Sequence, residues 1–213
     1  MKTSNLAITV AVIAAITGCA SPERSRSLND PSVPARAIAE QVCSNCHGVD
    51  GNSVSPNFPR LAGQMPAYLA AQLSEFRSHK RLDPAGFEYM WGLSRHLSDD
   101  QIKGLADYFA AQHPKANQPG DPVRVASGRE VFEKGVPAAN IPPCATCHGA
   151  SAFGNASFPR LANQHADYLV KQLEVFRKTD ERPEGVVMKT IAHDLTRANI
   201  EAVAQYLQSL PPT

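Results

Sequence analysis

Two short clusters of cysteine and histidine are the residues of this sequence best placed to do chemistry. Each is a Cys-x-x-Cys-His box, and the two boxes begin 101 residues apart. Their members are Cys43, Cys46, His47, Cys144, Cys147 and His148. Two thiols three positions apart can each form a thioether with one vinyl group of the same porphyrin, and the adjoining imidazole then reaches the iron from one side. The boxes therefore predict two covalently bound haem c groups, with His47 and His148 as proximal ligands.

Cys-x-x-Cys pairs also occur in zinc sites, thiol redox centres and disulfides. A four-cysteine zinc ribbon places its second pair about 15–20 residues after the first, a much shorter gap than the one here. A zinc site built on one pair needs a fourth ligand, and its histidine need not follow the second cysteine directly. A thioredoxin-type motif accompanies a βαβ pattern, and this sequence has no convincing strand runs. A disulfide stays open in an oxidising compartment, but it does not explain the repeated histidine, so haem attachment is favoured.

The sequence around the boxes is duplicated. The run Phe-Pro-Arg-Leu-Ala at 58–62 recurs at 158–162. Seven further positions recur 100 residues later: Gln64, Tyr68, Leu69, Gln72, Leu73, Phe76 and Arg77 match Gln164, Tyr168, Leu169, Gln172, Leu173, Phe176 and Arg177. Each half closes with an apolar stripe at helical spacing, which starts at Ile102 in the first half and at Ile200 in the second. The chain therefore contains two copies of one haem-binding unit.

The repeat also narrows the choice of the sixth iron ligand. The chain has four methionines, and Met1 falls in a segment that we expect to be removed. Met90 and Met188 match each other, each seven residues before a leucine, whereas Met65 aligns with His165. A thioether opposite histidine stabilises ferrous iron and suits an electron carrier. Met90 and Met188 are therefore the predicted axial ligands. The alternative is that both fill gaps in the core, with Met65 as the fallback ligand in the first half.

The other five histidines are assigned no role in iron binding. They are His79, His96, His113, His165 and His193. His96 and His193 fall one register apart in the repeat, and the other three have no histidine opposite them. A bis-histidine iron site is therefore not expected, and all five are predicted at the surface or in local hydrogen bonds.

The N-terminus predicts export from the cytoplasm. Lys2 precedes a mainly apolar run of eleven residues at 6–16, too short for a bilayer, which needs about 20 residues. Cys19 follows Thr17-Gly18 and belongs to neither box, and its setting resembles the lipobox of bacterial lipoproteins. We therefore expect Cys19 to carry lipid and to anchor the protein to a membrane on the periplasmic side. The alternative is ordinary cleavage near Ala20, which gives a soluble periplasmic protein.

The scaffold that positions these residues is predicted to be all-α. Five segments divide the chain: a signal peptide at 1–18, a flexible polar tether at 19–33, a first domain at 34–113, a Pro-rich linker at 114–122 and a second domain at 123–213. Domains of this size have limited capacity to form an apolar core. A buried porphyrin is therefore expected to supply much of each core.

Helices are expected to hold each box in place. One precedes each box, at about 35–42 and 123–134, and a Pro-rich loop at 135–143 is inserted before the second box. A middle helix starts near Pro66 in one half and near His165 in the other, with apolar residues along one face.

The last helix of the first half opens with a capping box, Ser98-x-x-Gln101. Met90 and Met188 are expected in the loops just before the last helices. A loop there can bring the sulfur over the haem face opposite the histidine.

Charge does not single out a partner. Residues 34–113 carry seven Lys and Arg against eight Asp and Glu, and residues 121–213 carry ten of each. No basic stripe indicates nucleic acid. Arg60 and Arg160 match in the repeat and are candidates to pair with haem propionates, and solvated surface arginine is the alternative.

The combined pattern resembles the cytochrome c4 family, and the resemblance covers both halves from about Ala35 onward. It rests on Cys-x-x-Cys-His-Gly, then Phe-Pro-Arg-Leu-Ala-Gly-Gln, then Tyr-Leu-x-x-Gln-Leu-x-x-Phe-Arg, and a methionine before a Leu-Ser-Asp helix. It implies two cytochrome-c-like all-α haem domains in tandem, related by pseudo-twofold symmetry and each with His–Met ligation. It also implies that the carbonyls of Pro59 and Pro159 accept a hydrogen bond from the ligand histidines.

The same resemblance implies an electron carrier of a bacterial periplasmic respiratory chain, working between a membrane donor and a terminal haem–copper oxidase. No catalytic residue and no small-molecule substrate are expected, because both irons would be six-coordinate. Two alternatives stay open. One is a dihaem enzyme, either a peroxidase or a sulfur-compound dehydrogenase, and the other is a fixed electron-relay subunit of a larger oxidoreductase.

The halves differ next to the predicted haem sites. The second half reads Ala-Asn-Gln at 162–164 where the first reads Ala-Gly-Gln at 62–64. It also reads Gly-Ala-Ser-Ala at 149–152 where the first reads Gly-Val-Asp-Gly at 48–51. These differences predict unequal haem environments and different reduction potentials.

Overall fold

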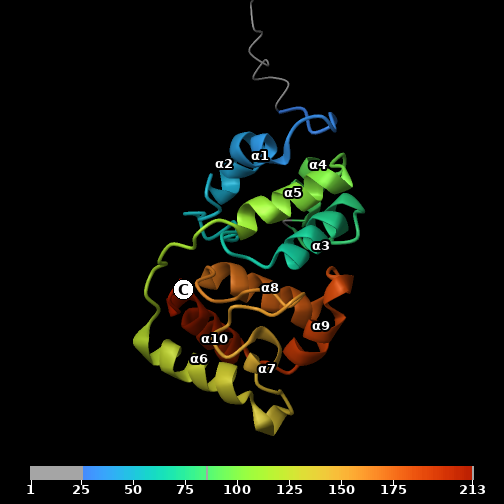
Figure 1. Ribbon diagram of the computed structural model, residues 1–213. Helices are drawn as coiled ribbons and strands as arrows, with labels where there is room; N and C mark the ends of the chain where they lie inside the picture. Colours follow the sequence, from blue (N-terminus) through green and yellow to red (C-terminus); the bar gives the residue numbers. More distant parts are fainter. Residues whose placement is uncertain (1–25, 85, 213) are drawn as a thin grey trace, which may run out of the picture.

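The computed structural model describes residues 26–84 and 86–212. Helices form its regular structure, and β pairing in these residues is limited to two isolated bridges. Two groups of helices stack one above the other (Figure 1), each around its own cluster of buried apolar side chains. The prediction of two tandem all-α domains is confirmed. None of the helices in the described residues is long and apolar enough to cross a membrane. Cys19 and the predicted signal peptide lie outside the described residues.

The first domain consists of several short helices, two of which carry the Cys-x-x-Cys-His box, and of two longer helices. In chain order they are α1 (Ala35–Ile38), the π-helix η2 (Ala39–Cys43), α2 (Ser44–His47), α3 (Pro66–Arg77), the π-helix η3 (Gly86–Met90), α4 (Trp91–Ser94) and α5 (Asp99–Ala110). The predicted capping box opens α5, because Ser98 Oγ accepts from Gln101 N and Gln101 Oε1 accepts from Ser98 N. The apolar face of α5 packs against α1 and α3 and closes the core.

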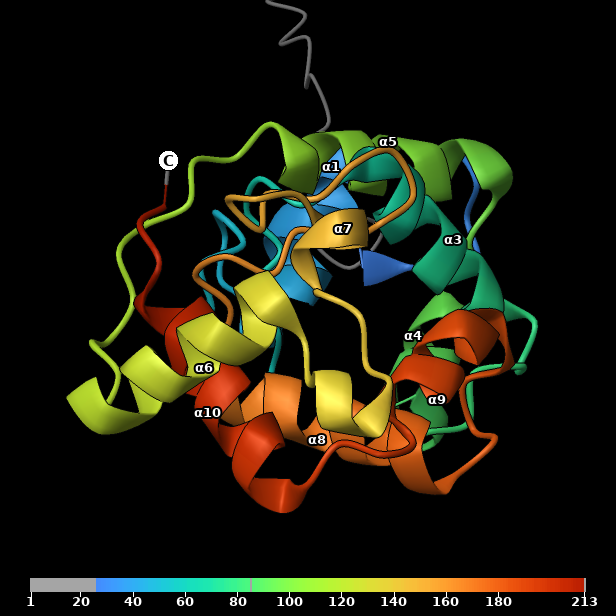
Figure 2. The same ribbon diagram turned by 90° about the horizontal axis from the view of Figure 1, so that it is seen from below.

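The second domain repeats this plan. Its helices are α6 (Pro122–Lys134), the 3₁₀ turn η4 (Pro137–Ala139), α7 (Ala145–His148), α8 (Ala166–Lys178), the 3₁₀ turn η5 (Pro183–Gly185), α9 (Val186–Ala192) and α10 (Arg197–Ser209). Helix α10 packs against α6 and α8 (Figure 2), and Phe132 and Ile200 are fully buried in this core. Thr196 and Asn199 form a second capping box at the start of α10, which the sequence analysis did not single out.

The structure corrects the expected position of the two methionines. They do not lie in loops: Met90 is the last residue of η3, and Met188 lies inside α9. The sequence did not predict these helical turns. Their apolar side chains, such as Phe87 and Val186, are exposed, so the apolar residues do not form the regular stripe by which a half-buried helix is recognised.

The structure also shortens the predicted tether at 19–33. Val33 is buried in the first core, and Leu28 packs against that core. The Gln101 side chain donates to the carbonyls of Asp30 (3.0 Å) and Val33 (3.1 Å). Two isolated apolar residues in a polar segment have no periodicity, so composition alone did not reveal this packing.

The linker is held against both domains. Lys115 N donates to Asn52 Oδ1 in the first domain (2.8 Å), and Asn163 Nδ2 in the second domain donates to Lys115 O (2.7 Å). These bonds tie the linker to the interface between the domains.

Candidate haem centres

Each box lies on a helical turn that points both thiols the same way. Cys43 ends η2 and Cys46 follows one turn later in α2, while Cys144 precedes α7 and Cys147 lies within it. Residues three apart share one side of a helix, so each pair is arranged for a single macrocycle. None of the four forms a disulfide, so all are available for thioether bonds. The described residues contain no group of three or more His, Cys, Asp or Glu able to hold a metal ion, as a zinc site would need.

The two box histidines are buried and held by a carbonyl. His47 Nδ1 lies 2.9 Å from Pro59 O, and His148 Nδ1 lies 3.0 Å from Pro159 O. A carbonyl can only accept, so Nδ1 carries the proton and Nε2 keeps its lone pair for a metal. Burial lowers the pKa of both imidazoles, which favours this neutral form. Both rings are thus fixed in the tautomer that leaves Nε2 available to a haem iron.

The Pro–Arg segments are held close to the boxes by a backbone turn. Leu61 N and Ala62 N both donate to Gly51 O (2.7 and 3.1 Å). In the second domain Leu161 N and Ala162 N donate in the same way to Ala152 O, at 2.8 and 2.9 Å. This turn is what brings the proline carbonyl to the histidine.

The methionines lie on the helical segment between the middle and last helices of each domain. Both Met90 and Met188 are half-buried, and Met188 packs against the second apolar cluster. Met65 occupies the N-cap position of α3, and its counterpart His165 occupies that of α8. Met65 therefore lies at the start of α3, whereas Met90 lies in the segment that follows the end of that helix.

The two matched arginines are half-buried beside the interface. Arg60 donates through its terminal nitrogens to Asn52 and Asn163, and Arg160 Nη2 donates to Pro212 O (2.6 Å). No acceptor in the described residues reaches the buried Arg60 Nε. An unpaired buried N–H is costly, so this atom suits an anionic acceptor such as a haem propionate. The thiol pairs, the free imidazole nitrogens and this donor together fit a haem c group.

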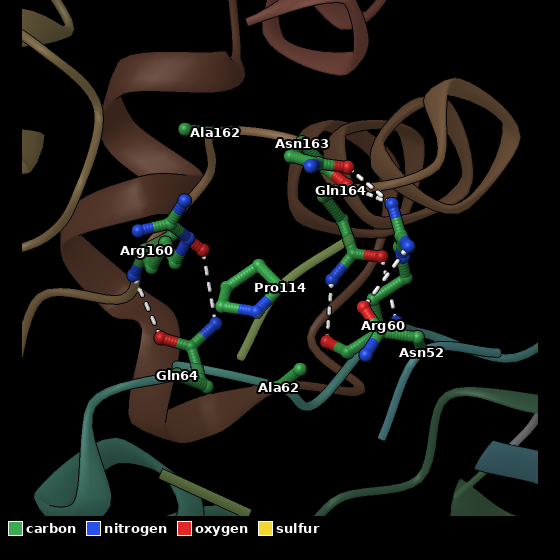
Figure 3. A pocket seen from close by; sticks show the side chains of 9 residues that line it. All are labelled: Asn52, Arg60, Ala62, Gln64, Pro114, Arg160, Ala162, Asn163 and Gln164. Carbon is green, nitrogen blue, oxygen red and sulfur yellow. Dashed lines mark hydrogen bonds between the residues drawn. The ribbon is translucent and has the colours of Figure 1, made fainter. Parts of the chain in front are cut away.

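Two glutamines join the domains (Figure 3). Arg60 N donates to Gln164 Oε1 (2.8 Å), and Gln164 Nε2 donates to Arg60 O (3.0 Å). The symmetric pair is Arg160 N to Gln64 Oε1 (2.7 Å) and Gln64 Nε2 to Arg160 O (2.9 Å). The sequence analysis noted that Gln64 recurs as Gln164 but assigned neither glutamine a role. That recurrence was the one feature of the sequence that could have indicated their importance.

A second, charged cluster joins the domains through side chains that the sequence analysis did not connect. Arg81 and Arg182 each donate to the side-chain carbonyls of both Gln72 and Gln172. Arg81 also pairs with Asp83. The two glutamines recur at the 100-residue spacing of the repeat and were recognised as a matched pair. The two arginines are 101 residues apart, because the segments that carry them differ in length, and so they were not recognised as equivalent.

The prediction for the remaining histidines is correct for four of them and wrong for His165. The four exposed ones are His79, His96, His113 and His193. His165 is buried at the interface, where its Nε2 lies 2.9 Å from Ser53 O of the first domain. Its environment depends on a residue 112 positions away, which no local pattern indicates.

Comparisons with known proteins agree with this geometry. A profile of the Cytochrome c family matches residues 32–112 and 125–211. The cytochrome c4 of Pseudomonas aeruginosa is 40% identical over 173 residues, which cover 79% of this chain and 84% of that protein. The crystal structure of reduced cytochrome c4 from Pseudomonas stutzeri has a TM-score of 0.74 and 36% identity, and covers 86% of this chain and 100% of that one. A thiosulfate dehydrogenase electron acceptor from Thiomonas intermedia is 33% identical over 183 residues, covering 80% of each chain.

Proposed function

This chain belongs to the cytochrome c4 family, and on that premise we propose that it carries electrons in a bacterial periplasmic respiratory chain, towards a terminal oxidase. Two haem c groups are covalently attached, one through Cys43 and Cys46 and one through Cys144 and Cys147. Each haem, when bound, supplies a one-electron iron couple. The protein's part is to ligate, orient and shield that couple.

The proposed axial ligands are His47 and Met90 in the first domain and His148 and Met188 in the second. The hydrogen bond from each histidine Nδ1 to a proline carbonyl is the observation that carries the two histidine assignments, and the match of Met90 with Met188 in the repeat supports the two methionines. The bond leaves the Nε2 lone pair available to a metal and raises the basicity of the ligand. With a histidine and a methionine as ligands, each iron would have no coordination position open to a substrate, which suits transfer of electrons without substrate chemistry.

Arg60 and Arg160 are proposed to neutralise haem propionates at the interface. Support comes from the unpartnered Arg60 Nε and from burial, which lowers the pKa of both guanidinium groups. A nearby carboxylate would offset that cost of burial.

We propose that Cys19 carries a lipid anchor after removal of residues 1–18, and that the folded domains face the periplasm. The sequence before Cys19 supports this, and a tether of several residues would let the domains reach a membrane partner. Restriction to a membrane surface raises the effective concentration of carrier and partner. Mass spectrometry of the mature N-terminus tests this point: an unmodified terminus near Ala20 would rule out the anchor.

A second candidate role is delivery of electrons from a sulfur-compound dehydrogenase. The similarity to a thiosulfate dehydrogenase electron acceptor favours it. In that role the chain would be a bound relay subunit, with the same ligands and attachment sites. Co-purification from membranes distinguishes the roles: a stable complex with a dehydrogenase supports the relay, and recovery with an oxidase or alone supports the diffusing carrier.

Near-infrared magnetic circular dichroism of the oxidised holoprotein tests the ligation. We expect a methionine-to-ferric-iron signal that corresponds to two haems per chain. Met90→Ala and Met188→Ala should each remove half of it, whereas Met65→Ala, the matched control, should leave it whole. A high-spin component in the unaltered protein, or loss of signal in the Met65 variant, would overturn the assignment and favour an open iron of the enzyme type.

A further inference from the structure

The two interface glutamines are held in one orientation. Gln64 Oε1 accepts from Met65 N (2.9 Å) as well as from Arg160 N, and Gln164 Oε1 accepts from His165 N (3.0 Å) as well as from Arg60 N. Two backbone N–H donors on one atom identify that atom as the oxygen, so the amide orientation follows from the bonding. Both side chains are buried, with 6% of their surface exposed.

Each glutamine binds the same peptide group that binds the histidine of the other domain. The carbonyl of Pro59 and the N–H of Arg60 belong to one peptide unit. Its oxygen accepts from His47 Nδ1 and its N–H donates to Gln164 Oε1. The unit formed by Pro159 and Arg160 repeats this arrangement with His148 and Gln64.

Hydrogen bonds at the two ends of a peptide unit strengthen each other. When the N–H donates to an acceptor, the amide polarises and its carbonyl oxygen becomes a better acceptor, an effect of about 10–30% per bond. A stronger bond to Nδ1 gives the histidine more imidazolate character, and a more basic ligand favours ferric iron. The glutamine of one domain therefore acts on the histidine of the other without touching it.

We propose that Gln64 and Gln164 are positioning residues that tune reduction potentials crosswise: Gln164 sets that of the first haem and Gln64 that of the second. This proposal deepens the electron-carrier function and rests on it. It makes each potential depend on correct contact between the domains. A domain that separates from its partner would then hold its haem at a higher potential.

Methionine has about the length of glutamine and lacks the amide. Replacing each glutamine by methionine therefore gives a pattern of potential shifts that simple loosening of the interface between the domains would not give. In Gln164→Met we expect the midpoint potential of the first haem to rise by more than that of the second. Gln64→Met should show the reverse. Each variant thus contains its own control, the haem of the domain that carries the substitution.

Potentiometric titration followed by paramagnetic NMR gives each haem its own value, with signals assigned to domains through the Met90 and Met188 variants. A second readout does not depend on potential. In the reduced protein the Nδ1 proton of His47 should move upfield in Gln164→Met, because its hydrogen bond weakens, and that of His148 should move in Gln64→Met.

A further variant protects the test against loosening of the interface. Gln72→Met is the matched interface control, because Gln72 binds Arg81 and Arg182 and neither Pro–Arg peptide, so it should leave the difference between the haems unchanged.

Equal shifts of both haems, a larger shift on the substituted domain's own haem, or a selective shift in Gln72→Met would overturn the proposal. The unaltered protein separates this failure from failure of the proposed function. If its two haems are not His–Met ligated, the carrier assignment fails; if they are and the crosswise pattern is absent, only the tuning fails.

Discussion

The two domains place different residues at equivalent left-handed positions of one scaffold. Gly51 (φ 68°) corresponds to Ala152 (φ 57°), and Gly63 (φ 64°) corresponds to Asn163 (φ 65°). The equivalence is structural, because Gly51 O and Ala152 O each accept from the following Leu and Ala backbones. The backbone is thus retained in both halves while the side chains that surround it differ.

The position of the linker explains the second difference. A Cβ added to Gly63 would lie 2.7 Å from Pro114 of the linker, so that domain has no room for a side chain. Asn163 tolerates the left-handed region, and its carboxamide binds both Arg60 and Lys115 O. The single linker meets the two equivalent sites differently: Pro114 fills the space beside Gly63, whereas the carbonyl of Lys115 accepts a hydrogen bond from the Asn163 side chain. The interface is therefore asymmetric although the two glutamine bridges are symmetric.

The largest difference in stability is expected between the ion pairs that the two buried arginines form, one in each domain. Asp83 is 1% exposed and pairs with Arg81 at 2.7 Å, whereas its counterpart Glu184 has 18% of its side chain exposed and pairs with Arg182 at 2.8 Å. Burial alone would raise the pKa of Asp83, but the hydrogen bond and charge of Arg81 lower it. Removal of one partner of a buried pair costs about 3–5 kcal/mol.

We therefore expect Asp83→Asn to lower the free energy of unfolding of the holoprotein by about 3 kcal/mol, and Glu184→Gln to lower it by about 1 kcal/mol or less. Denaturant titration followed by circular dichroism measures both. Equal losses would mean that the cluster is as symmetric as the bridges.

A second test exchanges the residues at the first left-handed position. A Cβ on Gly51 would lie 2.8 Å from Ala62 N and 3.0 Å from the ring of Phe109. Leu207 of the second domain is equivalent to Phe109 of the first. Phe109 O accepts from Gly63 N, and Leu207 O accepts in the same way from Asn163 N. Gly51→Ala should destabilise the first domain by about 2 kcal/mol, from overpacking and left-handed strain.

Phe109→Leu in the same chain should restore part of that loss, because it makes room in the way the second domain does. Ala152→Gly is the control and should change stability by about 1 kcal/mol or less. A double variant no more stable than the sum of the single changes would show that Phe109 does not restrict this position.

The role of the proline carbonyls was expected from the resemblance to the cytochrome c4 family, whereas the haem boxes could be predicted because they depend on a short spacing that the repeat displays twice. The helices that bury an apolar stripe, α3, α5, α8 and α10, were predicted for the same reason. The turns that carry Met90 and Met188 were not, because their apolar side chains are exposed. Contacts between the domains were beyond prediction, since Ser53 meets His165 and Gln72 meets Arg182 only after both domains have folded.

The smallest expected effect is a pH dependence confined to the second domain's side of the interface. His165 replaces Met65 of the first domain at the start of the middle helix. Burial lowers the pKa of its imidazole below the ordinary value of about 6.5, and the nearby Arg60 charge lowers it further, although the bond to Ser53 O opposes both. The folded interface therefore favours the neutral form of the His165 imidazole.

A lowered pKa means that the unfolded chain binds more protons than the folded one in this range, so stability rises with pH. The contribution of His165 is complete well above pH of about 6.5 and is lost as the pH falls from there through the folded pKa. In His165→Met, which copies the first domain, no group titrates at this position. The difference between the unfolding free energies of the two holoproteins should therefore shrink on acidification from pH of about 7.5 to about 5. A difference that stays constant over this range would show that the pKa of His165 is the same in the folded and the unfolded chain, and that the exchange of Met65 for histidine has no consequence for pH.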